Sequence, residues 1–260
     1  MILQTNTMQT QRIEQGAITP EFTMIDSETS LPSKGAFYPK NSRIFAVRGL
    51  RFREQAEITN IFNSLNDDNQ LQCLIAVFNI YKNCIIIEGV PFESILAEDM
   101  TALAMFIVLL TNKDQVYHIS KKCPKCGEVQ NYKIDIQEAE IEYSDMECLE
   151  AVTMDTDIGK LFIAPLTVKD VIELEREAPD ELRAMMADSP YIKRLNGKEL
   201  TTDEKFDAFG NLSYADVISL LEQTNKYRSF PKPIKFKCET EGCENELEIA
   251  PRINILKGVP

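Results

Sequence analysis

Hydrophobic residues in the N-terminal half of the chain recur at the spacing of helices that bury one face. In residues 54–65 and 71–81, apolar side chains return every three or four positions, which is the period of an amphipathic helix. A third apolar run follows Asp99, and we expect this aspartate to be the N-cap of a helix. Short strands are expected at 43–50 and 84–87. The pattern predicts a mainly helical domain with short strands over residues 31–114.

Beyond residue 115 the hydrophobic period changes to two, which is typical of strands. The segments 115–137 and 232–252 each predict a β-hairpin, and each carries two cysteines at its turn. The first turn contains Cys123-Pro124-Lys125-Cys126-Gly127, and the second contains Cys238 and Cys243. A CxxC or CxxxxC loop turns both sulfurs inward, and four thiolates complete a tetrahedral shell with no open position. The spacing therefore predicts a split zinc ribbon with one structural Zn²⁺ per chain, bound by Cys123, Cys126, Cys238 and Cys243.

Other interpretations of these cysteines stay open. Four unrelated reduced thiols are one alternative, and a redox CxxC pair is another. His118 lies five residues before Cys123 and is a candidate ligand, although a strand histidine is the simpler interpretation. The remaining cysteines have apolar neighbours and are expected in the core: Cys73, Cys84 and Cys148. The lysines that flank the two pairs are interpreted as compensating the charge of the site: Lys121, Lys122, Lys125, Lys235 and Lys237.

Between the hairpins lies an insertion, residues 138–231, that is acidic and mainly helical in pattern. Thr167 with Asp170, and Ser213 with Asp216, have the spacing of helix N-terminal caps, so helices are expected at about 168–187 and 214–228. One further strand is expected at 160–164. The predicted fold class is α+β: a helical N-terminal half plus a split zinc-ribbon-like pair of β-hairpins interrupted by the acidic insertion.

The two ends of the chain lack this periodicity. Residues 1–30 are polar and are expected to form a flexible N-terminal arm, and residues 253–260 a C-terminal tail. The N-terminus shows no signal-peptide pattern. The most apolar run, 102–110, is about half the length that a bilayer requires. We therefore expect a protein of the reducing cytoplasm, with no membrane attachment.

Charge is distributed unevenly along the 260 residues, whose formal net charge is −13. Residues 127–190 contain 17 acidic and 5 basic side chains, so this segment alone carries −12. The balance argues against a nucleic-acid binder, which needs a basic face. The acidic run is either a solvated face or a surface that docks on a basic partner. A single histidine, and the lack of any phosphate-loop, GxSxG or dinucleotide pattern, indicate a protein that is not an enzyme and has no small-molecule substrate.

Three motifs in order resemble a known family. They are Leu31-Pro32-Ser33-Lys34-Gly35 followed by Tyr38, the apolar helix after Asp99, and Val116-Tyr117-His118-Ile119 leading to the first cysteine pair. Together they resemble the baseplate hub assembly proteins of T-even-like contractile-tailed bacteriophages. The likeness covers roughly residues 31–137, with the second cysteine pair in support.

The resemblance implies a component of the central baseplate hub, or a factor that promotes hub assembly, acting by protein–protein contacts. Its partners would be other tail and baseplate hub proteins, which it would meet in the host cytoplasm during assembly. The protein itself would either remain in the virion tail or leave after assembly. The entry segment supplies the candidate partner-binding residues: Leu31, Pro32, Lys34, Gly35, Phe37 and Tyr38. The alternative function is a zinc-ribbon nucleic-acid-binding or transcription accessory protein, with the lysines beside the cysteines as its basic patch.

Overall fold

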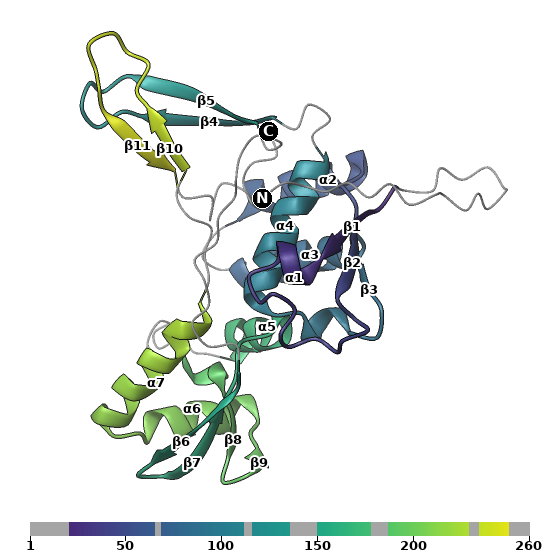
Figure 1. Ribbon diagram of the computed structural model, residues 1–260, viewed down its shortest axis with the longest axis vertical. Helices are drawn as coiled ribbons and strands as arrows, with labels where there is room; N and C mark the ends of the chain where they lie inside the picture. Colours follow the sequence, from purple (N-terminus) through teal and green to yellow (C-terminus); the bar gives the residue numbers. More distant parts are fainter. Residues whose placement is uncertain are drawn as a thin grey trace, which may run out of the picture.

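The computed structural model describes residues 21–65, 69–111, 116–135, 150–177, 187–228 and 234–249. Three parts follow one another along the long axis of the molecule: two β-hairpins, a central body, and a smaller α+β part (Figure 1). The α+β fold class expected from the sequence is confirmed.

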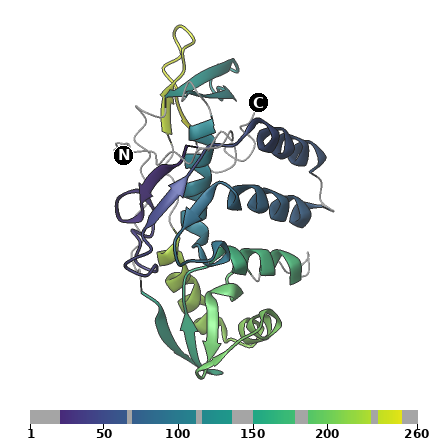
Figure 2. The ribbon, with the colours of Figure 1, turned by 90° about the vertical axis from the view of Figure 1, so that its right-hand side faces the viewer.

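The central body places a small sheet on one side of a buried helix and further helices on the other (Figure 2). The antiparallel sheet has the order β1-β2-β3, with β1 at Thr23–Asp26, β2 at Ile44–Val47 and β3 at Ile85–Ile87. The helices are α1 (Ser27–Ser30), α2 (Phe52–Ser64), α3 (Gln70–Lys82) and α4 (Ala97–Thr111), with a short 3-10 helix η1 at Phe92–Ser94. The sequence therefore predicted the helices α2, α3 and α4 and the strands β2 and β3 close to their observed bounds.

Helix α4 is the centre of this body. Its run of alanine, leucine, methionine and phenylalanine is apolar on every side, so it is stable only when covered all round. The turn after β2 passes so close to its last residues that a Cβ on Gly49 would lie 2.5 Å from the carbonyl oxygen of Leu110. Among the described residues, no helix has the length and apolarity needed to cross a membrane.

Asp99 is inside α4 and is not its N-cap, because the helix begins two residues earlier at Ala97. The carboxylate is fully buried and accepts hydrogen bonds from the backbone N–H and the hydroxyl of Ser33, at 2.9 and 2.5 Å, and from the Tyr38 hydroxyl at 2.8 Å. The Tyr38 oxygen in turn accepts the backbone N–H of Leu96 at 3.0 Å. Burial raises the pKa of Asp99, and the hydrogen bonds from Ser33 and Tyr38 offset part of this rise.

The segment predicted as an N-terminal arm is partly folded. Within its described portion, residues 23–30 form β1 and α1, and Ile25 is buried in the central core. A single buried isoleucine in a polar stretch produces too little periodicity to predict a strand. Residues 1–20, and the C-terminal tail 253–260, lie outside the described part of the chain.

The insertion contains a sheet of which the sequence predicted only one strand. Four antiparallel strands have the order β6-β7-β8-β9: β6 at Val152–Thr156, β7 at Gly159–Ile163, β8 at Ile192–Leu195 and β9 at Lys198–Glu199. Helices α5 (Val168–Glu177), α6 (Thr202–Gly210) and α7 (Tyr214–Tyr227) and a 3-10 helix η2 (Ser189–Tyr191) accompany it. Residues 178–186 of the expected helix 168–187 lie outside the described residues.

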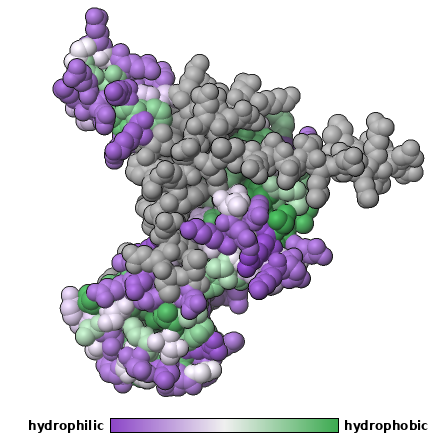
Figure 3. Space-filling model, in the orientation of Figure 1, coloured by the Kyte–Doolittle hydropathy of each residue, from purple (hydrophilic) through white to green (hydrophobic). Residues whose placement is uncertain are grey.

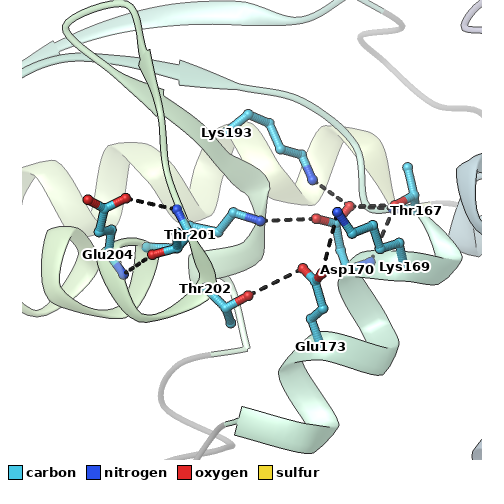
Figure 4. A network of polar contacts seen from close by, with 9 residues as sticks. Thr167, Lys169, Asp170, Glu173, Lys193, Thr201, Thr202 and Glu204 are labelled. Carbon is cyan, nitrogen blue, oxygen red and sulfur yellow. Dashed lines mark hydrogen bonds and ion pairs between the residues drawn. The ribbon is translucent and has the colours of Figure 1, made fainter.

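A buried charge cluster joins this part to the central body (Figure 4). Helix α5 packs Val168 into the central core, and two residues later it places the nearly buried Asp170 against the insertion. The Asp170 carboxylate accepts Lys193 Nζ of β8 at 2.6 Å and lies 3.3 Å from Lys205 Nζ of α6. It also accepts the backbone N–H of Thr167 at 2.8 Å, so one side chain caps α5 and holds both lysines.

The two cysteine hairpins have the predicted strands. They comprise β4 (Val116–Lys122) with β5 (Val129–Asp135), and β10 (Ile234–Lys237) with β11 (Glu246–Ile249). Each pair is antiparallel and continuous in register. The alternation of apolar and polar residues between turn signals was therefore sufficient to predict both.

We expect Asp99→Ala to lower the free energy of unfolding by about 2–4 kcal/mol, because three buried donors lose their acceptor. Urea denaturation followed by circular dichroism measures the change. Asp203→Ala is the matched control, since Asp203 also lies in the first turn of a helix but is exposed. Equal stability of the two variants would contradict the role of Asp99.

Asp170→Asn should cost about 3 kcal/mol at neutral pH, because two lysines lose their buried counter-ion. Burial alone would raise the pKa of Asp170, but Lys193 lowers it overall. This carboxylate therefore stabilises the fold above the unfolded aspartate pKa of about 3.9, and the contribution disappears as the pH falls through the lower folded value.

The difference between the parent protein and Asp170→Asn should accordingly shrink between neutral pH and about pH 2. Urea denaturation at several pH values tests this, with the exposed Asp207→Asn as control. A difference that is constant over this range would show that the ion pairs contribute nothing.

Candidate metal centre

The two hairpin turns meet at one end of the molecule (Figure 1). The sulfur atoms of Cys123, Cys126, Cys238 and Cys243 all lie within 4.8 Å of one another. Two close separations join the hairpins: 3.8 Å from Cys123 Sγ to Cys243 Sγ, and 3.7 Å from Cys126 Sγ to Cys238 Sγ. The pairs are thus brought together from positions far apart in the sequence.

These distances fit a single tetrahedral metal ion. A metal–sulfur bond of about 2.3 Å in a regular tetrahedron gives sulfur–sulfur edges of about 3.8 Å. Three of the four cysteines are buried, and Cys126 is exposed. The described residues therefore provide four thiolate ligands, which fill a tetrahedral shell completely.

The two turns share one backbone hydrogen bond, in which the N–H of the first cysteine donates to the returning strand: Cys123 to the Glu128 carbonyl at 2.8 Å, and Cys238 to the Asn245 carbonyl at 2.9 Å. In the first, the N–H of Gly127 donates to the Cys123 carbonyl at 2.9 Å, and Gly127 has a φ of 80°, a conformation that favours glycine. In the second, the N–H of Cys243 donates to the Thr240 carbonyl at 2.9 Å, and Gly242 has a φ of 78°. The inner hydrogen bonds of the two turns differ, since the first spans four residues and the second three, while both turns use a glycine at positive φ.

Polar side chains around the sulfurs were not predicted from the sequence. Thr240 Oγ1 lies 3.4 Å from Cys238 Sγ and 3.6 Å from Cys126 Sγ, and it accepts Gln130 Nε2 at 2.8 Å. Asn245 Nδ2 donates to Cys123 Sγ at 3.6 Å. Such contacts orient metal ligands and stabilise the thiolate form. Their only sequence signal was proximity to the cysteines.

The surroundings of the thiols lower the pKa of two cysteines and raise that of a third. Backbone hydrogen bonding from Cys126 lowers the pKa of Cys123 to about 6, and that from Glu128 lowers the pKa of Cys126. A backbone hydrogen bond from Asn245 would lower the pKa of Cys243, but burial and the neighbouring thiols raise it to about 11. Because a metal binds the thiolate form, the Cys243 proton leaves when a cation is bound.

Among the hairpin residues whose side chains the structure describes, the apolar contact beside the cysteines is small. The buried cluster consists of three cysteines, Tyr132 and Leu247, with Phe236 and Leu109 packed against it. The rings of Tyr132 and Phe236 lie 4.7 Å apart between centroids. Leu109 belongs to α4 and also packs against the central core, so it connects the two regions.

Two of the predicted lysines contact Glu248 of β11. Lys121 Nζ donates to the backbone carbonyl of Glu248, and Lys235 Nζ lies 3.5 Å from the Glu248 carboxylate. The first contact joins the two hairpins, from β4 to β11, and the second lies within the second hairpin, where Lys235 and Glu248 are cross-strand partners. Charge compensation of the cluster by lysine thus stays a prediction.

The other predicted residues lie elsewhere. Cys73 and Cys84 are buried in the central body as expected, while Cys148 lies outside the described residues. His118 is on β4 opposite Lys133, and its side chain is not described.

The entry segment proposed as a partner surface is mostly internal. Leu31, Pro32, Gly35 and Tyr38 are buried, and Phe37 is half-buried. A Cβ on Gly35 would lie 2.5 Å from Ser27 Oγ, so the segment packs tightly against α1. Lys34 is exposed. The motif therefore anchors the chain to α4 through Asp99, and its buried members are not available to a partner in this conformation.

We expect the chain to bind one Co²⁺, used as a spectroscopic probe, with the absorption of a tetrahedral tetrathiolate complex. Cys238→Ser should lose this spectrum, and Thr240→Val should weaken binding by about 10- to 100-fold because it removes the hydroxyl beside two sulfurs. Cys73→Ser, at a buried cysteine outside the cluster, should bind as the parent does. Retention of the tetrathiolate spectrum in Cys238→Ser would contradict the assignment.

Comparison with known proteins identifies the family. The family described as T4 bacteriophage base plate protein matches residues 24–253, a span that includes both hairpins, the central body and the insertion. No curated protein matches the chain significantly, and no solved structure does either. Because the match covers most of the 260 residues, the chain belongs to the T4 bacteriophage base plate protein family.

Proposed function

We propose that the chain is a component of the central hub of the phage tail baseplate, or a factor that assembles this hub, and that it acts by protein–protein contacts. The observation that carries the proposal is the family match over residues 24–253, which spans all three parts of the molecule. The order of the entry motif, the apolar helix and the CPKCG turn supports the hub assignment within that family.

The proposal includes one structural Zn²⁺ bound by the four cysteines. An all-thiolate tetrahedral set is typical of zinc, and it leaves no position for a reacting water. Of the hairpin residues whose side chains are described, Tyr132 and Leu247 are the apolar ones buried beside the cysteines, and this part of the hairpins gains little from apolar burial. The bound ion would therefore supply much of the free energy that holds the two hairpins together.

The same proposal assigns no enzymatic activity to the chain. Its partners would be other hub and tail proteins, met in the host cytoplasm during assembly, and the acidic residues of the insertion favour a partner with a basic face. The buried acids of the insertion are committed to internal contacts, as Asp170 is to two lysines and Asp188 to Arg228. Docking would therefore use the exposed acids.

The test is a phage that lacks the gene for this chain, complemented from a plasmid. Without the chain, infected cells should accumulate tail components but few complete baseplates. The parent chain and Cys73→Ser should restore plaque formation, whereas Cys238→Ser should not, because it breaks the metal site.

Mass spectrometry of purified virions then separates the two versions of the role, since a component remains in the particle and an assembly factor does not. Complete tails in the absence of the chain would overturn the proposal. Binding to nucleic acid that weakens steeply with salt would support the transcription alternative instead.

A further inference from the structure

The three-stranded sheet of the central body has one face in the core and one at the surface. Ile25, Phe45, Val47 and Ile85 point inward. On the other face, Met24, Ile44 and Ile86 keep 41%, 45% and 56% of their surface exposed. The register places Ala46 between Met24 and Ile86, so these apolar residues are neighbours across the strands. Figure 3 shows hydrophobic side chains at the surface beside β2 and β3.

Strand β3 is also an edge of the sheet. It consists of three isoleucines, and among the described strands it pairs with β2 alone. Figure 1 shows it at the outer margin of the molecule. Over the ranges that the structure describes, no backbone hydrogen bond reaches the other side of β3. Edge strands are blunted by shortness, lysine, proline or a bulge; β3 is short, but it carries no lysine or proline and pairs with β2 without a bulge.

Two exposed carboxylates lie at one end of this surface. Glu88 directly follows β3 and is exposed, and Asp26 lies at the same end of the sheet, opposite Ile44. In the part of the chain that is described, neither carboxylate forms an ion pair, whereas the nearby Glu28 is paired with Arg43. Apolar side chains beside an unpaired carboxylate favour a partner that carries both apolar and basic groups.

We propose that the β3 edge, with the outer face around Ile86, binds an extended segment of another protein. The segment would add a fourth strand beside β3, place apolar side chains against Ile86, and place a lysine or arginine near Glu88. The proposal rests on the proposed function, because it names a surface through which a baseplate protein acts on its partner.

A second copy of the chain is a poorer occupant of this surface. Each copy carries a net charge of −13 and presents the same exposed acids, so association of two copies is opposed by like charge. The same negative charge attracts a basic partner and so favours its binding. The complementary charge is therefore the reason to assign the surface to a different protein.

The probe is a labelled heptapeptide, Lys-Thr-Val-Thr-Ile-Thr-Lys, which as a strand presents lysine, valine, isoleucine and lysine on one face. Its controls replace both lysines by glutamate, or methylate alternate backbone nitrogens to remove strand hydrogen bonds. Fluorescence anisotropy with the full chain should show the lysine peptide binding about tenfold or more tightly than either control.

Two variants of the chain locate the site. Ile86→Lys should weaken binding about tenfold or more, because it puts a charge at the edge strand. Phe52→Lys is the matched control: Phe52 is an apolar residue 88% exposed at the start of α2, and the variant makes the same change in net charge. It should bind as the parent does. Glu88→Lys should reverse the preference between the lysine and glutamate peptides.

Equal binding by Ile86→Lys and Phe52→Lys would overturn the proposal, and so would tight binding of the methylated peptide. A concentration-dependent dimer that Ile86→Lys abolishes would assign the surface to a second copy and also overturn it. Peptide binding tests the β3 surface, and phage complementation tests the hub role. A negative peptide result would therefore not contradict the hub role, and a negative complementation result would not contradict the peptide binding.

Discussion

The burial of α4 is the constraint on which the rest of the structure depends. This helix is apolar on every side, so no single neighbour can cover it. The sheet covers one side, α3 and α5 contribute to the others, and the hairpin cluster reaches its end through Leu109. The parts of the molecule are therefore arranged around one element, because each has to supply part of its cover.

Polar groups fix the positions that apolar burial alone would leave variable. Asp99 is the fully buried carboxylate of α4, and its three donors come from a segment more than sixty residues earlier. Asp170 of α5 is the corresponding buried carboxylate between the central body and the insertion, where it pairs with one lysine of β8 and one of α6. Hydrophobic packing tolerates small slides between surfaces, whereas a buried carboxylate accepts only the few arrangements that satisfy it.

What could be predicted from the sequence was local. The hairpins and their cysteine turns depend on residues within about twenty positions, and alternation with turn glycines specifies both. Asp99 looked like a cap because its neighbours in the sequence suit a helix start, and its true partners, Ser33 and Tyr38, are distant. Most of the β6–β9 sheet was not predicted. Strands β8 and β9 are rich in charged residues, and they are extended because they pair with neighbouring strands and not because of an apolar pattern. The polar residues around the sulfurs, such as Thr240 and Asn245, are positioned by the meeting of two hairpins.

The cysteine cluster has a consequence for the order in which the chain is completed. The 111 residues between Cys126 and Cys238 form a loop that is closed when both turns share one ion. A crosslink of about 100 residues restricts the unfolded chain by an amount on the order of 4–5 kcal/mol. A chain still being synthesised, and ending before Cys238, has two ligands and an open loop. With the proposed ion, the centre would close only after the insertion has been made, so metal retention would distinguish a chain that extends past Cys243 from one that ends before Cys238.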